Sequence, residues 1–308
     1  MNPAPQLLPA PRCGLPKPLL PEEIDPIVRA ALHEDVGAGD LTGDGAVPDL
    51  AQAKGTLIAK QLGVVAGLDV FLRTFVLVDG DVVTSKNLND GDAVTPGRKV
   101  ATVTGNARAL LRAERVALNL LQRMSGTATL TAQFTQRVSH LPQVRILDTR
   151  KTTPGLRIFE KYAVRCGGGE NHRIGLYDEA MLKDNHIELA GSSIEEALKR
   201  LREHVGPNVR ITAEARDGKE AQAAIQGGAD VVLLDNFSPL QLREWCAPLR
   251  RLAQELGRSI ELEASGGIVL ENVRAYGEAG VDRISVGALT HSAKALDFSL
   301  ELEPLRGI

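Results

Sequence analysis

Residues 209–235 read VRITAEARDGKEAQAAIQGGADVVLLD, and this stretch contains a strand, a helix and a second strand in that order. The strand candidates are Val209–Glu214 and Asp230–Asp235, and Lys219–Gln226 between them has helical character. Two strands that are joined by a crossover helix run parallel in a sheet. The stretch therefore predicts a parallel sheet with its helices on the outside.

The same alternation extends on both sides of this stretch, from about residue 126 onward. Further strand candidates are Val144–Asp148, Glu179–Lys183, Ile260–Ala264 and Arg283–Val286, and further helical stretches are Ile194–His204, Leu240–Leu256 and Leu270–Ala279. Six successive strands favour closure into a barrel over a single mononucleotide-binding unit, with an open sheet as the alternative.

The first 125 residues follow a different pattern, in which short strands are broken by glycine. Helices are predicted over Pro21–Val36, around Asp69–Val78 and from Ala107 to about Ser125, with turns over Gly37–Gly45. The strand candidates are Gly55–Lys60, Gly63–Val65, Asp81–Ser85 and Lys99–Thr104. The predicted organisation is an irregular Pro-rich lead-in (1–20), an N-terminal α/β sandwich-like module (21–125) and an open, incomplete TIM-like α/β barrel (126–292), with residues 293–308 packing back on the module.

Composition excludes several classes of protein. The chain has 308 residues, a net charge of −3 and only 3% aromatic residues, which argues against a nucleic-acid-binding surface. The longest stretch without a charged residue, Met124–Gln136, is too short and too polar to span a bilayer. The three cysteines, Cys13, Cys166 and Cys246, form neither a disulfide framework nor a zinc-ligand cluster. We expect a cytoplasmic protein, because no apolar run of signal-peptide length is present.

Familiar catalytic signatures are absent as well. The sequence has no GxxxxGK[ST], GxGxxG, HExxH or GxSxG motif. This argues against P-loop ATPases, Rossmann dehydrogenases, zinc proteases of the HExxH type and serine hydrolases.

Polar residues follow every predicted strand of the barrel. In parallel α/β barrels, residues at the C-terminal strand ends meet at one mouth, where the active site is built. The alternative is that each is a solvated loop residue, which is less convincing for six strands in succession. The residues in question are Asp148-Thr149-Arg150-Lys151, Lys183, Glu214, Asp235, Ser265-Gly266-Gly267, and Val286-Gly287-Ala288 with His291 shortly after.

Each group of these residues suggests a chemistry. Several cations at one site need a substrate with several negative charges, and arginine binds carboxylates in a bidentate manner. Glu214 and Asp235 could hold Mg²⁺, accept hydrogen bonds from sugar hydroxyls or act as an acid/base pair, and ion pairing with nearby cations is the alternative. The two glycine turns after the last strands are suited to phosphate. The cations are Arg150, Lys151, His172, Arg173 and Lys183.

Five segments of the sequence resemble the quinolinate phosphoribosyltransferase family. The resemblance covers roughly residues 22–300, and such long contiguous matches are specific. The segments are RAERVALNLLQRMSG (112–126), DTRKTTPGLR (148–157), CGGGENHRIGLYDEAMLKDNH (166–186), EASGG (263–267) and ISVGALTHS (284–292).

The resemblance implies an N-terminal module packed against an open barrel, in a homodimer where Arg115 reaches into the partner's site. It implies that Arg150, Lys151, His172, Arg173 and Lys183, beside Thr149, hold the carboxylates of quinolinate and the phosphates of phosphoribosyl pyrophosphate. The catalytic residues would be Lys151, Lys183, Glu214 and Asp235. Of these, Glu214 and Asp235 would also bind ribose hydroxyls and Mg²⁺. The 5-phosphate would be held by Ser265, Gly266, Gly267, Val286, Gly287, Ala288 and His291.

The implied reaction forms nicotinate mononucleotide, pyrophosphate and CO₂. Three alternatives stay open from the sequence. They are a related phosphoribosyltransferase that acts on another ligand, a barrel lyase or isomerase that acts on a sugar phosphate, and a non-catalytic anion-binding protein. The arginines argue against the first two, and the two acids argue against the third.

Overall fold

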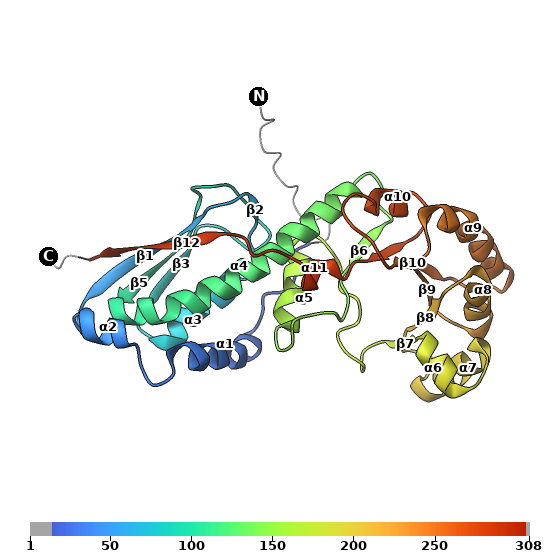
Figure 1. The fold of residues 1–308 in the computed structure, drawn as a ribbon, viewed down its shortest axis with the longest axis horizontal. Helices are drawn as coiled ribbons and strands as arrows, with labels where there is room; N and C mark the ends of the chain where they lie inside the picture. Colours follow the sequence, from blue (N-terminus) through green and yellow to red (C-terminus); the bar gives the residue numbers. More distant parts are fainter. Residues whose placement is uncertain (1–13, 306–308) are drawn as a thin grey trace, which may run out of the picture. The chain divides into compact units, whose positions relative to one another are not determined.

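A computed structural model describes residues 14–305 of the chain. These residues form two compact units, shown in Figure 1. The first unit contains residues 14–133, 152–169 and 289–305, and the second contains residues 134–151 and 170–288. Cys13 and most of the Pro-rich lead-in lie outside the described residues.

The second unit is built on a six-stranded parallel sheet in the order β6-β11-β10-β9-β8-β7. All six strands predicted for the barrel are confirmed. The first and last strands of this order, β6 and β7, do not pair with each other within residues 14–305, so the sheet is an open barrel. The strands are β6 (Arg145–Leu147), β7 (Ala180–Leu182), β8 (Ile211–Ala215), β9 (Val231–Asp235), β10 (Glu261–Ser265) and β11 (Arg283–Ser285).

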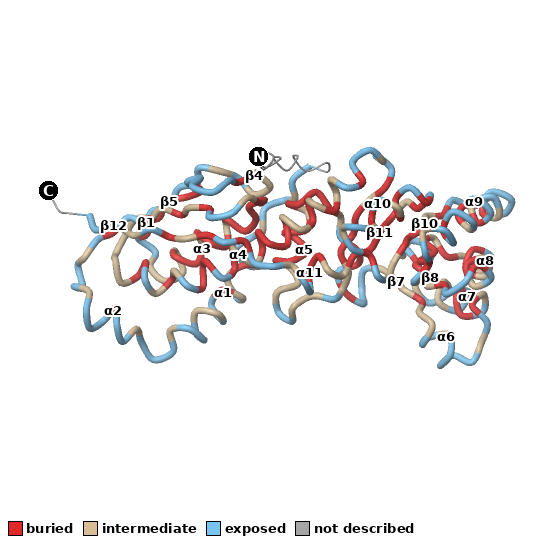
Figure 2. The backbone as a smooth tube through the Cα atoms, turned by 45° about the horizontal axis from the view of Figure 1, so that its top comes forward, coloured by how far each residue is buried: buried red, intermediate tan, exposed pale blue. Residues whose placement is uncertain are grey.

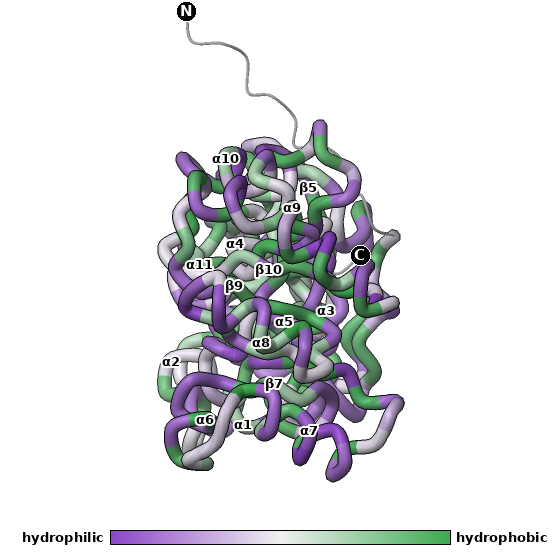
Figure 3. Tube along the Cα trace, turned by 90° about the vertical axis from the view of Figure 1, so that its right-hand side faces the viewer, coloured by the Kyte–Doolittle hydropathy of each residue, from purple (hydrophilic) through white to green (hydrophobic). Residues whose placement is uncertain are grey.

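Helices connect these strands and keep them parallel. Their starts are marked by capping side chains, as at Asp217, which accepts hydrogen bonds from the backbone of Lys219 and Glu220. Much of α7 is hydrophilic (Figure 3), and its buried residues are few. Figure 2 shows the strands mostly as buried and α6 as mostly exposed. The helices are α6 (Asp184–Ala190), α7 (Ile194–Val205), α8 (Gly218–Gly227), α9 (Pro239–Glu255) and α10 (Val273–Gly277). Helix α11 (Ala288–His291) follows the last parallel strand, and from Leu289 onward it belongs to the first unit.

The first unit contains a four-stranded antiparallel sheet in the order β12-β1-β5-β3. Helices α3 (Leu68–Val78) and α4 (Ala107–Arg137) contribute Phe71 and Leu110 to a core shared with Leu57 of the sheet. A small pair of strands, β2 (Gly63–Val64) and β4 (Ala93–Val94), lies apart from this sheet. The four strands are β1 (Gln52–Ala59), β3 (Val83–Lys86), β5 (Lys99–Asn106) and β12 (Phe298–Pro304).

A second apolar cluster of this unit joins three helices. It contains Val28 of α1 (Pro21–Val36), Met124 of α4 and Phe159 of α5 (Arg157–Cys166). Helix α5 follows β6 in the chain but belongs to the first unit. The segment between β6 and β7 therefore contributes no helix to the parallel sheet, and the sheet is open between these two strands.

Two predictions from the sequence are wrong. The turn predicted over Gly37–Gly45 contains helix α2 (Leu41–Ala46), because Asp40 caps it by accepting a hydrogen bond from the backbone N of Gly43 at 2.9 Å. The helix expected to end near Ser125 continues to Arg137.

The extension of α4 has two physical reasons. The hydroxyl of Thr129 donates to the carbonyl of Ser125 at 2.7 Å, so this polar stretch satisfies its hydroxyls within the helix. At Gly126, a Cβ would lie 2.0 Å from the carbonyl oxygen of Lys294. This glycine therefore permits a close approach between two segments, and it does not end the helix.

Candidate active site

The register of the parallel sheet brings the predicted strand-end residues to one edge. Asp235 pairs with Ser265, and Ser265 pairs with Ser285 at the end of β11. Glu214 pairs with Leu233, two residues before Asp235. Because paired residues direct their side chains to the same face, Glu214 and Asp235 share one face of the sheet.

Glu214 and Lys183 form the ion pair of this edge. Lys183 Nζ lies 3.5 Å from Glu214 Oε2, and the two side chains are 45% and 14% exposed. Burial raises the pKa of Glu214, the negative charges of Asp235 and Asp184 raise it further, and Lys183 opposes both. Asp235 accepts a hydrogen bond from the side chain of Asn236 at 2.7 Å. The edge thus holds two neighbouring carboxylates with one cation beside them.

The raised pKa of Glu214 leads to a stability prediction. The folded protein binds a proton at Glu214 more readily than the unfolded chain does, so this group reduces stability as the pH rises through the raised pKa. We expect Glu214→Gln to gain stability relative to the wild type as the pH rises above about 4.3, the unfolded value, and through the raised pKa, measured as Tm in a pH series.

Glu220 provides a control of opposite sign. A hydrogen bond from Arg216 lowers the pKa of Glu220, so the stability that Glu220 contributes is gained as the pH rises to about 4.3 and stays constant above that pH. Glu220→Gln should therefore lose stability relative to the wild type over this acidic range and show a constant difference at higher pH. Parallel Tm curves for Glu214→Gln and the wild type would contradict the prediction.

The turn after β10 needs glycine for steric reasons. Gly266 has φ +97°, and a Cβ there would lie 2.2 Å from Asn236 Oδ1. Gly267 also has a positive φ, of +61°. After β11, the backbone N of Val286 donates to the carbonyl of Leu147 at 2.9 Å, and Gly287 follows. Both turns present backbone without side chains at the carboxyl edge of the sheet, which suits an anion.

A buried acid at the end of β6 holds the segment that contains His172 and Arg173. Asp148 is fully buried and accepts a hydrogen bond from the backbone N of His172 at 2.8 Å. The ring nitrogen Nδ1 of His172 in turn accepts from the backbone N of Arg173 at 2.7 Å. Asp148 therefore connects the end of β6 to the segment that carries His172 and Arg173.

Arg173 is a poorly solvated cation. Its Nη1 donates to the carbonyl of Glu179 at 3.2 Å. Burial lowers the pKa of Arg173, the positive charge of Arg150 lowers it further, and the acids Glu179 and Asp178 oppose this. Two guanidinium groups that repel each other, one of them buried, favour an anion beside them.

A buried ion-pair network, which was not predicted from the sequence, lies beneath this edge. Glu263 is fully buried, with Oε2 3.0 Å from Arg283 Nε and Oε1 3.4 Å from His172 Nε2. Ser285 donates a hydrogen bond to the same Oε1. Burial acts to raise the pKa of Glu263, but the neighbouring His172 ring and the charge of Arg283 outweigh it, so the pKa is lowered. The sequence contains one signal for this network, since Glu263 and Arg283 are charged residues inside predicted strands.

Both family models that match the chain describe one family. Residues 40–125 match the N-terminal domain of quinolinate phosphoribosyl transferase, and residues 127–301 match its C-terminal domain. The chain belongs to the quinolinate phosphoribosyltransferase family.

Named relatives and solved structures agree with this membership. A probable nicotinate-nucleotide pyrophosphorylase [carboxylating] of Bacillus subtilis is 44% identical over 87% of this chain and 90% of its own length. A quinolinate phosphoribosyltransferase [decarboxylating] of Nicotiana tabacum is 40% identical over 90% of this chain and 81% of its own length. The crystal structure of NadC from Streptococcus pyogenes has a TM-score of 0.88 and 39% identity, and it covers 94% of this chain and 100% of that one.

Three of the site residues implied by the quinolinate phosphoribosyltransferase resemblance are exposed, and two of these three belong to the first unit. Arg115, on α4, and His291, at the end of α11, belong to the first unit, and both are exposed. Nδ1 of His291 lies 2.6 Å from Ser292 Oγ. Lys151 is exposed, and its backbone N donates to Thr149 Oγ1 at 3.1 Å.

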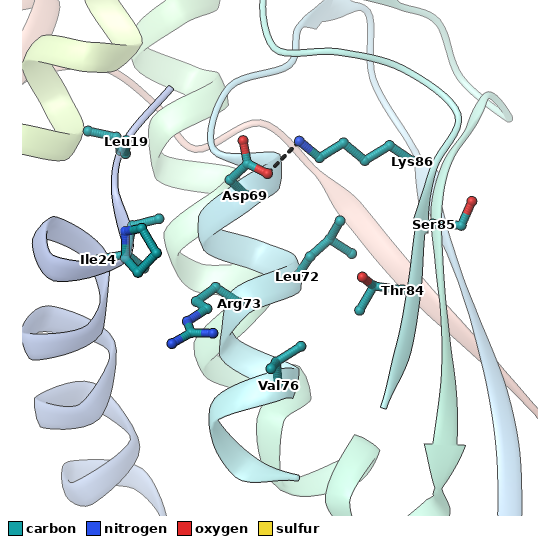
Figure 4. A pocket seen from close by; sticks show the side chains of 10 residues that line it. Leu19, Ile24, Asp69, Leu72, Arg73, Val76, Thr84, Ser85 and Lys86 are labelled. Carbon is teal, nitrogen blue, oxygen red and sulfur yellow. Dashed lines mark ion pairs between the residues drawn. The ribbon is translucent and has the colours of Figure 1, made fainter. Parts of the chain in front are cut away.

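A cavity of about 430 Å³ lies elsewhere, in the first unit between α1, α3 and β3 (Figure 4). Its charged lining residues are neutralised, because Lys86 pairs with Asp69, and Arg73 pairs with Asp25 at 2.7 Å. It contains none of the site residues that the family resemblance implies. The cavity is therefore poorly suited to a substrate with several negative charges.

Two kinds of feature are absent from residues 14–305. These residues contain no group of three or more His, Cys, Asp or Glu side chains that could hold a metal ion. They also contain no helix with the length and apolar character needed to cross a bilayer.

Proposed function

We propose that the protein transfers the phosphoribosyl group of phosphoribosyl pyrophosphate to quinolinate with loss of CO₂, forming nicotinate mononucleotide and pyrophosphate. The names of the relatives support this reaction, since "carboxylating" and "decarboxylating" describe it in opposite directions. The observation that carries the proposal is that Lys183, two carboxylates and two glycine turns lie at one edge of the parallel sheet.

Quinolinate would be bound by the basic residues after β6 and before β7. Arg150 and Arg173 supply planar donors that match two carboxylates, and Thr149 and His172 lie beside them in the chain. The mutual repulsion of the arginines supports this assignment, because a dicarboxylate would relieve it. The resulting selectivity would favour a pyridine dicarboxylate over nicotinate, which has one carboxylate.

Phosphoribosyl pyrophosphate would be bound across the other strand ends. We assign the ribose hydroxyls to Glu214 and Asp235, and the pyrophosphate to Lys151 and Lys183. The positive φ values at Gly266 and Gly267 support a backbone cradle for the 5-phosphate. The rest of that cradle would come from Ser265, Val286, Gly287, Ala288 and His291.

The two carboxylates fit a Mg²⁺ ion that arrives with the substrate. Mg²⁺ is commonly held by one or two carboxylates together with substrate phosphates. Glu214 and Asp235 match this pattern, and residues 14–305 offer no larger cluster of ligands. When bound, the ion would neutralise charge on the departing pyrophosphate.

The residues of the edge would act mainly by binding and positioning. The pyridine nitrogen of quinolinate uses its lone pair to bond to the anomeric carbon as the bond to pyrophosphate breaks, so no proton has to be removed. Lys151 and Lys183 would stabilise the leaving pyrophosphate. The ring nitrogen becomes positive, the 2-carboxylate leaves as CO₂, and a proton replaces it on the ring. Arg150 and Arg173 would hold the ring in line for the attack.

We further propose a homodimer in which Arg115 completes the partner's site. Exposed apolar side chains support an interface on each unit. Leu41 is 94% exposed in the first unit, and in the second unit Tyr177 is 83% and Leu189 88% exposed. In the proposed homodimer, the partner would cover these side chains. The cytoplasmic location expected from the sequence stays a prediction.

The function is tested by a direct assay with purified protein, phosphoribosyl pyrophosphate and Mg²⁺. Quinolinate and nicotinate are supplied separately, and nicotinate mononucleotide is quantified. We expect product from quinolinate alone and loss of activity with EDTA. Product from nicotinate instead would overturn the substrate. No product from either would favour the two alternatives of a related phosphoribosyltransferase that acts on another ligand and a non-catalytic anion-binding protein.

A further inference from the structure

We propose that Glu263 is a positioning residue that orients Arg173 for the substrate by acting through the ring of His172. This inference rests on the proposed function, because Arg173 is the residue assigned to a substrate carboxylate. Glu263 lies on β10, is fully buried and is not expected to touch substrate itself.

His172 connects Glu263 to Arg173 through its two ring nitrogens. Nδ1 accepts the backbone N–H of Arg173 at 2.7 Å, so Nδ1 carries no hydrogen in this arrangement. The ring hydrogen must then be on Nε2, which faces Glu263 Oε1 at 3.4 Å. A carboxylate at this place therefore selects one tautomer of the ring, and that tautomer accepts from Arg173.

The two oxygens of Glu263 have separate partners. Oε2 lies 3.0 Å from Arg283 Nε, an ion pair that would already compensate the buried charge. Oε1 faces His172 and accepts the hydroxyl hydrogen bond of Ser285. A carboxylate that served only to neutralise Arg283 would not need this second set of contacts, which supports a role toward His172.

The far end of the connection is anchored as well. The backbone N of His172 donates to the buried Asp148, and the guanidinium of Arg173 donates to the carbonyl of Glu179. Glu179 accepts a hydrogen bond from Thr212 Oγ1 at 2.6 Å. Buried and part-buried contacts thus fix both the backbone and the side chain of Arg173.

Glu261 offers a matched control for Glu263. It lies two residues earlier on the same strand and faces the same side of the sheet. Glu261 also pairs with Arg283, at 3.4 Å, and additionally with Arg145 and Arg210. Its interactions are with arginines, and His172 is not among them. Glu261→Gln and Glu263→Gln therefore both weaken the pairing of Arg283, and only Glu263→Gln changes the contact with His172.

The first test compares the kinetics of the two variants. We expect Glu263→Gln to raise the KM for quinolinate roughly 10- to 100-fold through misplacement of Arg173, with the KM for phosphoribosyl pyrophosphate within about twofold of the wild type. Glu261→Gln should leave the ratio of the two KM values unchanged. Adding Glu263→Gln to His172→Gln should cause little further loss, because Glu263 acts through His172. Equal changes in both single variants would overturn the inference.

The second test determines the tautomer of the His172 ring directly and needs no substrate. Heteronuclear NMR of the full chain distinguishes the two histidine tautomers, and His172→Gln identifies the signal of His172 by its loss. We expect the Nε2–H tautomer in the wild type and in Glu261→Gln, and an altered signal in Glu263→Gln. The Nδ1–H tautomer in the wild type would overturn the inference. A wild type that binds no quinolinate but shows the expected tautomer would overturn the proposed function instead.

Discussion

Mixing an Arg115→Ala variant with a Lys183→Ala variant is expected to restore about a quarter of the wild-type activity, although each variant alone is nearly inactive. In the proposed homodimer, each site needs Lys183 from one subunit and Arg115 from the other. Random exchange gives mixed pairs in half of the dimers, and each mixed pair contains one intact site and one that lacks both side chains. Activity is measured after the variants are dissociated and reassembled together.

The mixing experiment separates two arrangements of Arg115. If Arg115 served the site of its own subunit, every site in the mixture would lack one of the two residues and no activity would return. A control mixture combines Lys183→Ala with Glu214→Ala, two residues that form an ion pair within one unit and so belong to the same subunit's site. Every site in this mixture lacks one of the two side chains. That mixture should stay inactive.

Arg150→Ala is expected to raise the KM for quinolinate about 100-fold, which corresponds to ~2.7 kcal/mol of binding free energy. The physical reason is the loss of a charge-assisted, bidentate contact with a carboxylate. The KM for phosphoribosyl pyrophosphate should change little. Steady-state kinetics with each substrate varied in turn provides the measurement.

Arg150→Lys is the matched variant for this prediction. Lysine keeps the positive charge but lacks the planar, forked set of donors. The KM of Arg150→Lys for quinolinate should therefore lie between those of the wild type and Arg150→Ala. Near-normal kinetics in Arg150→Ala would remove Arg150 from the site. An unchanged Tm in both variants would show that the effect arises in binding and not in folding.

The parallel sheet was predictable because its strands and helices alternate in the sequence with clear periodicity. The six strands of the second unit were found in this way, with boundaries that differ by a few residues. The opening between β6 and β7 was not decided by periodicity, because it depends on α5, which belongs to the first unit. The capped helix at Leu41–Ala46 was missed because its glycines are typical of turns.

The candidate site was predictable where strand ends carry charge, and less so where tertiary pairing decides the role of a side chain. Glu214, Asp235 and Ser265 could be placed at one edge from their positions after strands. Glu263 could not, because a charged residue within a strand has meaning only when its partners on neighbouring strands are known. The substrate itself came from the family resemblance and not from the charges.

The position of β12 has a consequence for the order in which the chain can fold. This strand pairs with β1, with Ala53 opposite Pro304, and so it joins segments from the two ends of the described chain. During synthesis, β1 leaves the ribosome long before β12, and the whole parallel sheet is made in between. Until β12 arrives, β1 is an exposed strand edge and the apolar residues that pack beside Leu300 are uncovered. Nascent chains should therefore be most prone to association during this interval, and the antiparallel sheet should acquire its protection from hydrogen exchange only after the parallel one is complete.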